Sequence, residues 1–344
     1  AGHIWKFITL AYIPPTIAGI VLAYRGKLLA GGILTAFFIA LQIMSNHVQM
    51  SYYFLFVILF IAGAYFEDAW RNKTLPQFFK ASAVLLVSAL IGVAANLSNL
   101  YHTYTYSKET MRGKSELVQT GDAAKQTSSG LDRDYITNWS YGIGETWTLL
   151  VPNFKGGSSS APLSQSEAAM EKANPMYGSL YNSLPQYFGS QPWTAGPVYV
   201  GAFVLFLFVL GCFIVKGPLK WALLGATFFS IVLAWGKNFM PLTDFFIDYV
   251  PMYNKFRAVS SILVIAEFTI PLLAIFALKR VLEEPGIWKA NKKAFGISLA
   301  LTAGVALLLT VAPGSLGAGF VPAQEAQMLQ NAVDQQMIPA NELS

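Results

Sequence analysis

Charge is the property this sequence has least of. Aspartate, glutamate, lysine and arginine together make up 12% of the 344 residues, whereas 54% are hydrophobic. A soluble domain of this size carries about twice that charged fraction. The apolar residues also gather into runs of roughly 17 to 22, the length a helix needs to cross ~30 Å of hydrocarbon. The composition therefore argues against an ordinary soluble domain and predicts an integral membrane protein.

Cysteine, histidine and common catalytic motifs are also scarce. Cys212 is the single cysteine and lies inside an apolar run, so no internal disulfide can form. The three histidines have no metal-ligand spacing, which excludes a structural zinc site. The sequence also lacks a Walker A loop, a GxSxG elbow, an HExxH helix and a dinucleotide fingerprint. These absences remove the commonest nucleotide-binding, hydrolase and metalloprotease assignments.

Eight apolar runs predict an all-α polytopic fold. The runs are 4–24, 28–44, 52–66, 81–97, 198–215, 221–235, 261–278 and 295–311. We therefore expect transmembrane helices 1–4 within residues 1–97 and helices 5–8 within 198–311. A large extracytoplasmic loop is expected at 98–197, and an extracytoplasmic tail at 312–344 is expected to lead into a further C-terminal region.

Basic residues predict the orientation. Lysine and arginine occur in the first, third, fifth and seventh gaps between runs, and the short second gap has none. The positive-inside rule makes the odd gaps cytoplasmic, which places both chain ends and the long loop outside. In the sixth gap, apolar and acidic residues between Pro241 and Pro251 predict an amphipathic helix within 239–253, lying in the headgroup plane.

The second gap and the start of the next run are dense in hydrogen-bonding side chains. His47, Gln49 and Tyr53 supply an imidazole, an amide and a phenol, which are groups that can bind a sugar or a phosphate. Helix capping and an interfacial aromatic belt are the competing explanation.

Two charged residues are candidates near the outer leaflet. Arg257 carries a guanidinium suited to bidentate phosphate binding, although pairing with lipid phosphate would also explain it. Glu267 is the only carboxylate within a predicted span, where an ionised group costs ~2.5–3.5 kcal/mol. Pro271 removes the amide that would bond the Glu267 carbonyl, so a polar notch is expected; a helix-packing contact is the alternative.

Glu145 is the candidate acid or base of the long loop. Glycines and aromatic residues surround it, and exclusion of water by such rings would raise the pKa of a carboxyl group. A carboxylate that caps backbone amides is the competing interpretation. Asp132 and Asp134, on either side of Arg133, are interpreted as a solvated charge cluster.

Several short sequence motifs occur in this chain in the same order as in one protein family. They are NHVQ (46–49), YY (52–53), YS (106–107), RG (112–113), YGIGE (141–145), VPN (151–153), GG (156–157), YFG (187–189), GPVYVG (196–201) and PMYNKFR (251–257). In this succession the chain resembles the YfhO-like bacterial membrane proteins, which are polytopic glycosyltransferases of the GT-C type. The likeness extends over residues 40–275, as a fragment without the N-terminal spans.

The resemblance implies an enzyme of the bacterial cytoplasmic membrane. Such an enzyme moves a sugar from a polyprenyl-phosphate carrier to a cell-envelope glycan or polymer outside the cell, with no role for nucleic acid. Its usual catalytic carboxylate lies in an outer loop upstream of this chain, so the catalytic residue is left unassigned. Residues expected to line the outer cavity are His47, Gln49, Arg112, Glu145 and Arg257, with Arg257 or Arg112 facing the carrier phosphate. A divalent metal is possible, without named ligands.

Two other classes of function stay open. A transporter or flippase for a lipid-linked or small polar substrate would use Glu267 as a coupling carboxylate, although no internal repeat is found. A membrane scaffold whose long loop binds a partner would tolerate changes at Glu145 and Arg257.

Overall fold

The protein is helical throughout the part that the structure describes. The computed structural model describes residues 4–110, 130–173, 175, 178–196 and 198–312, with a few single positions beyond them. Within these ranges no β-strand forms, and only two isolated β-bridges occur. The helical fold class predicted from the sequence is therefore confirmed.

The first four apolar runs each contain a helix or a helix pair. They are α1 (Ile4–Ala11) with α2 (Ile13–Tyr24), α3 (Leu28–Met44), α4 (Val48–Arg71) and α5 (Leu75–Ala94). A proline pair, Pro14–Pro15, marks the break between α1 and α2 because proline favours the first turn of a helix. Helix α4 extends beyond the predicted 52–66 at both ends. The polar residues outside the apolar run still continue the backbone hydrogen bonds of the helix.

The second half of the chain also consists of helices, several of them short. Its helices are α10 (Ala202–Ile214), α11 (Pro218–Ala234), α12 (Met240–Tyr249), α13 (Val264–Glu283), α14 (Ile287–Ala290), α15 (Lys292–Leu299) and α16 (Val305–Val311). A π-helical turn, η8 (Ala300–Gly304), joins α15 to α16, and the 3-10 turn η7 (Val259–Leu263) leads into α13.

Five helices are long and apolar enough to cross a membrane. They are Ile4–Tyr24, Val48–Arg71, Leu75–Ala94, Val259–Glu283 and Lys292–Val311. A sixth is added if α11 and the segment after it count as one span, but the two are bent by 105°. Helices α3 and α10 are apolar but short, with 17 and 13 residues. The membrane character is thus supported, and eight crossings remain a prediction.

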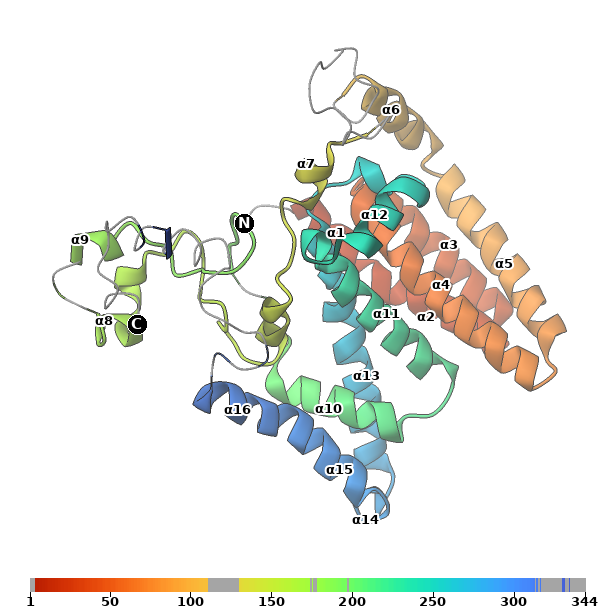
Figure 1. Ribbon diagram of the computed structural model, residues 1–344. Coiled ribbons are helices and arrows are strands. Elements are labelled where there is room, and N and C mark those ends of the chain that lie inside the picture. Colours follow the sequence, from red (N-terminus) through yellow and green to blue (C-terminus); the bar gives the residue numbers. More distant parts are fainter. Residues whose placement is uncertain are drawn as a thin grey trace.

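The apolar helices form two packed groups (Figure 1). Helix α3 packs between α2 and α5, while α10 packs against α13 and α15, and α11 connects the groups by touching both α4 and α13. Small residues permit the closest approach: a Cβ added at Gly31 would lie 2.5 Å from the Ala23 nitrogen of α2. Such contacts between small residues are how helices associate in lipid, where no hydrophobic driving force exists between them.

The two ends of the helix bundle differ in chemistry. The gaps after α2, α4, α10 and α13 lie at one end, whereas α6 (Leu97–Lys108), α7 (Arg133–Thr137) and α12 lie at the other (Figure 1). Arg25 and Lys216 come from separate gaps and line one pocket of about 410 Å³. We name these the basic end and the α12 end.

The predicted loop at 98–197 has structure of its own. It contains α6, α7, the 3-10 turn η2 (Gly144–Leu149) and the short helices α8 (Glu167–Met170) and α9 (Gly178–Tyr181). These elements are short because glycine, serine and proline interrupt the segment and leave little apolar surface to bury.

Candidate functional site

The first turn of α4 meets the segment before α13 at the α12 end. Gln49 makes the connection, because its Nε2 donates to the Tyr53 hydroxyl at 2.9 Å and to the Arg257 carbonyl at 2.7 Å. Tyr52, on the same face of α4, donates to the Pro251 carbonyl at 2.9 Å. The helix start and the PMYNKFR phrase are therefore held together by side chains from one helical face.

Local chain chemistry explains why α4 begins where it does. His47 is the N-cap residue of α4, and its Nδ1 accepts from the Met50 amide at 3.4 Å. Asn46 before it adopts a left-handed φ of 56°, which asparagine tolerates better than most residues. This geometry agrees with the capping explanation of His47.

Arg257 lies on two aromatic rings. Its guanidinium donates to the Tyr135 hydroxyl at 2.8 Å, and its carbon lies 5.5 Å from the centre of the Tyr135 ring and 5.9 Å from that of Trp139. The side chain is nevertheless exposed. A guanidinium held over rings loses less freedom on binding an anion, so the arrangement suits capture of a phosphate group.

The backbone on either side of Arg257 is fixed by the long loop. The Leu131 amide donates to the Asn254 carbonyl at 2.9 Å, and the Ala258 amide donates to the Ile136 carbonyl at 3.2 Å. Ala258 itself has a left-handed φ of 59°, a conformation that costs energy for a residue with a Cβ. Contacts on both sides therefore hold Arg257 in a bend that an isolated chain would rarely adopt.

A buried phenol next to this cluster has no hydrogen-bond partner. Tyr253 is 2% exposed, and its hydroxyl makes no hydrogen bond within the described part of the chain. Burial, with the phenols of Tyr53 and Tyr52 nearby, raises the pKa of Tyr253 well above its ordinary value, so it stays a donor. Buried polar atoms without a partner are rare in folded proteins. The hydroxyl is therefore available to a water molecule or to a ligand oxygen.

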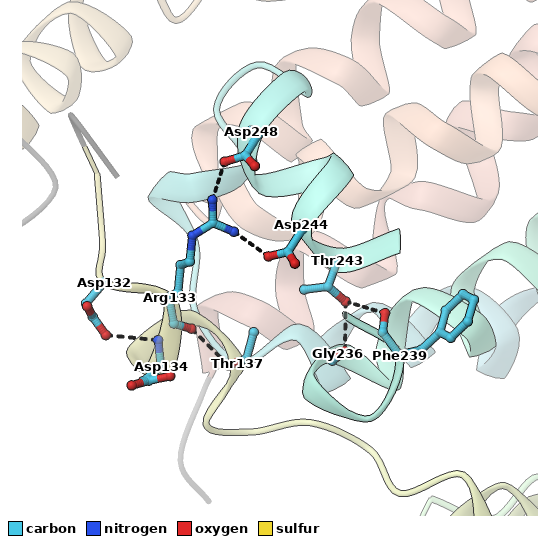
Figure 2. Close-up of polar contacts among 9 residues, drawn as sticks. All are labelled: Asp132, Arg133, Asp134, Thr137, Gly236, Phe239, Thr243, Asp244 and Asp248. Carbon is cyan, nitrogen blue, oxygen red and sulfur yellow. Dashed lines mark hydrogen bonds and ion pairs between the residues drawn. The ribbon is translucent and has the colours of Figure 1, made fainter. Parts of the chain in front are cut away.

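Figure 2 shows how α7 is attached to α12. The Arg133 guanidinium bridges the carboxylates of Asp244 and Asp248, which are one turn apart on α12. Asp132 caps α7 by accepting from the Asp134 and Tyr135 amides at 2.9 and 3.3 Å. Asp132 and Asp134 are exposed, as the predicted solvated cluster requires, but the prediction is wrong for Arg133, whose partners are two carboxylates distant in sequence.

Glu145 is buried inside the long loop. It is 3% exposed, and its carboxylate accepts from the Gly142 amide at 2.5 Å, the Tyr187 hydroxyl at 2.5 Å and the Ser190 amide at 3.3 Å. Gly189 is required there because an added Cβ would lie 2.4 Å from a carboxylate oxygen. This geometry agrees with a carboxylate that organises backbone amides.

A chain of hydrogen bonds leads from Glu145 toward Arg257. The Tyr187 hydroxyl that binds Glu145 also accepts from the Gln191 amide at 2.9 Å. The Gln191 side chain in turn accepts from the Ser260 hydroxyl at 3.1 Å, three residues beyond Arg257. Glu145 therefore supports the Arg257 segment from within the loop.

Glu267 lies on α13, near a lysine of α1. The Lys6 Nζ donates to the Ser261 hydroxyl at 3.3 Å and interacts electrostatically with the Glu267 carboxylate. Sequence reasoning did not single out Lys6, although a lysine two residues into an apolar run was a visible signal. Lys6 and Glu267 thus place opposite charges within two apolar helices, and the polar notch at Pro271 stays a prediction.

The structure brings some of the predicted site residues together. Gln49, Tyr53 and Arg257 form one cluster with His47 at its edge, whereas Glu267 sits with Lys6. Arg112 lies outside the described residues. No group of three or more histidine, cysteine or acidic side chains that would hold a metal occurs in the part of the chain that was described. The residues of these contacts that sequence reasoning missed are Tyr135 and Lys6.

Comparison with known proteins adds no further assignment. No family model, curated protein or solved structure matches the chain. The likeness to the YfhO-like family stays a prediction from short motifs, and the functional argument rests on the site.

Proposed function

We propose that the chain is part of a membrane glycosyltransferase that uses a polyprenyl-phosphate sugar donor. The acceptor is a cell-envelope glycan or polymer on the extracytoplasmic face of the bacterial cytoplasmic membrane, which corresponds to the α12 end. The observation that carries this proposal is the exposed Arg257 guanidinium, held on Tyr135 and Trp139 beside a cluster of hydrogen-bonding side chains.

Each member of the cluster has a role in this proposal. Arg257 binds the phosphate and stabilises the negative charge that develops on it as the sugar leaves. Gln49 holds the Arg257 backbone, and the unpartnered Tyr253 hydroxyl supplies a donor to a ligand oxygen. A carboxylate must also take the acceptor proton, and that base is left unassigned because Glu145 is enclosed by its own hydrogen bonds.

The proposal predicts that Arg257→Ala weakens binding of polyprenyl phosphate about tenfold or more. A hydrogen bond to a charged group contributes ~1.5–3 kcal/mol, and ~1.4 kcal/mol is a factor of ten. Binding to purified protein is measured by fluorescence competition, with Arg25→Ala as control because that arginine is exposed at the basic end. Arg257→Lys should retain part of the affinity. Unchanged affinity in folded Arg257→Ala would remove the assignment.

A transporter or flippase is the second candidate. The Lys6–Glu267 charge group favours it, because opposite charges within apolar helices are typical of substrate and ion pathways. The two functions are distinguished in vesicles that contain the protein and a labelled carrier lipid. Movement of the label across the bilayer without an acceptor would support transport, whereas acceptor-dependent loss of the sugar would support the transferase.

A further inference from the structure

An open groove runs between α4 and α11. It encloses about 680 Å³, and its apolar lining includes Phe56, Phe60 and Gly63 of α4 with Trp221 and Phe229 of α11. Phe60 packs on Gly225 of α11, where an added Cβ would lie 2.8 Å from the ring. Beside this contact the two helices leave an open trough.

The trough lies along a helix that is long and apolar enough to cross a membrane. The lining residues of α4 recur every three or four positions from Phe56 to Arg71, which places them on one face. Fifteen residues of α-helix rise about 22 Å, whereas one leaflet of hydrocarbon is about 15 Å deep. The trough is long enough for one extended lipid chain.

Two opposite charges stand at the basic end of this trough. Glu67 and Arg71 form an ion pair one helical turn apart, with side chains that are 53% and 79% exposed. An exposed pair of this kind adds little stability, so a ligand that bears both charges can replace it. A phosphate matches the guanidinium, and a primary ammonium matches the carboxylate.

We propose that this trough binds one phosphatidylethanolamine molecule from the leaflet at the basic end. An acyl chain lies on the phenylalanine rings, the phosphate binds Arg71 and the ammonium binds Glu67. This site is separate from the Arg257 cluster and does not depend on the proposed transferase activity. The Glu67 carboxylate favours this headgroup over two others. Phosphatidylglycerol has no ammonium group, and the quaternary ammonium of phosphatidylcholine has no N–H donors.

Native mass spectrometry of the full chain, released from nanodiscs that contain the three lipids in equal amounts, tests the proposal. We expect the protein to retain phosphatidylethanolamine several-fold over the other two. Glu67→Gln should abolish this preference while phosphate-bearing lipids still bind, and Arg71→Ala should lower the retention of all three. Equal retention of the three lipids by the unaltered protein would overturn the proposal.

A steric variant tests the trough without disturbing the fold. Nothing lies within 4 Å of a Cβ added at Gly63, so Gly63→Leu projects into the trough and also favours the helix. It should lower lipid retention about tenfold, since several buried methylene contacts are lost. Gly296→Leu is the matched control, because that helical glycine of α15 is equally open. Equal retention by both variants would contradict the proposal.

A second copy of the chain is the competing occupant. Gly63→Cys in a Cys212→Ala background has a single thiol, so an oxidised dimer in nanodiscs would place another copy in the trough and overturn the proposal. A thiol that stays monomeric, together with phosphatidylethanolamine retention, supports it.

Discussion

At the scale of single residues, the Tyr187 phenol connects the long loop to Glu145. Burial, then the charge of Glu145 and the hydrogen bond to it, raise the pKa of Tyr187 above its ordinary value of ~10. The phenol therefore loses its proton less readily in the folded loop than in the unfolded chain. Its contribution to stability is fully present below about pH 10 and is lost as the pH rises further.

We accordingly expect the loop to become sensitive to protease as the pH rises above about 10. Limited proteolysis of the purified protein, with cleavage between residues 130 and 196 scored, measures this change. Tyr187→Phe should reduce the alkaline increase and should cost ~2 kcal/mol or more at neutral pH, where the hydrogen bonds to Glu145 and from the Gln191 amide are both lost. Tyr199→Phe is the control, since the Tyr199 hydroxyl accepts from the nearby Ala202 amide and makes no hydrogen bond to the long loop among the residues that the structure describes. An identical alkaline profile in Tyr187→Phe would refute the link.

The contacts of a side chain were predictable from the sequence where its partners are close along the chain. The cap made by His47 and the glycines around Glu145 fall in this class. Partners that are far apart, such as Gln49 with the Arg257 carbonyl or Lys6 with Ser261, depend on how helices meet. Hydrophobic periodicity predicts which face of a helix is buried, but not which neighbouring element covers that face.

At the scale of elements, the attachment of α7 to α12 decides how the loop covers the Arg257 segment. The bridge from Arg133 to Asp244 and Asp248 is partly enclosed, with 24% of the arginine side chain exposed and 43% and 42% of the two carboxylates (Figure 2). Such a network holds its geometry better than a single surface pair.

Arg133→Ala should therefore destabilise the α7–α12 contact by about 1 kcal/mol, measured by hydrogen exchange of the α7 amides. Lys279→Ala is the matched control, because its partner Glu283 lies 3.8 Å away and both side chains are 64% exposed. We expect the control to change stability by less than ~0.5 kcal/mol. Equal effects of the two substitutions would show that the bridge acts as an ordinary surface pair.

Element boundaries were harder to predict than element type. The run at 198–215 yields a helix of only 13 residues, because Gly201 has a φ of 101° before the helix starts and Val215 is extended after it ends. A hydropathy profile contains no information about such backbone conformations. The 105° bend between α11 and the segment with α12 was predictable in kind, since Pro241 and the acidic residues interrupt the apolar pattern there.

At the scale of the whole molecule, the threading of the chain depends on α10. Its 13 residues rise about 20 Å, which is shorter than a hydrocarbon core of ~30 Å. If α10, α11 and α13 all cross, three crossings separate the long loop from the segment around α14. If α10 only dips into the bilayer, two crossings remain and the loop and the segment share a side.

Cysteine accessibility distinguishes these two topologies, because Cys212 is the only native thiol. In a Cys212→Ala background, Lys172→Cys reports the long loop and Lys289→Cys reports α14; both lysines are exposed. A membrane-impermeant maleimide added to intact cells should label Lys172→Cys at once and Lys289→Cys only after permeabilisation. Labelling of both in intact cells would mean that α10 does not cross. The lysine-rich segment around α14 would then face the same side as the long loop, and the positive-inside assignment would fail with it.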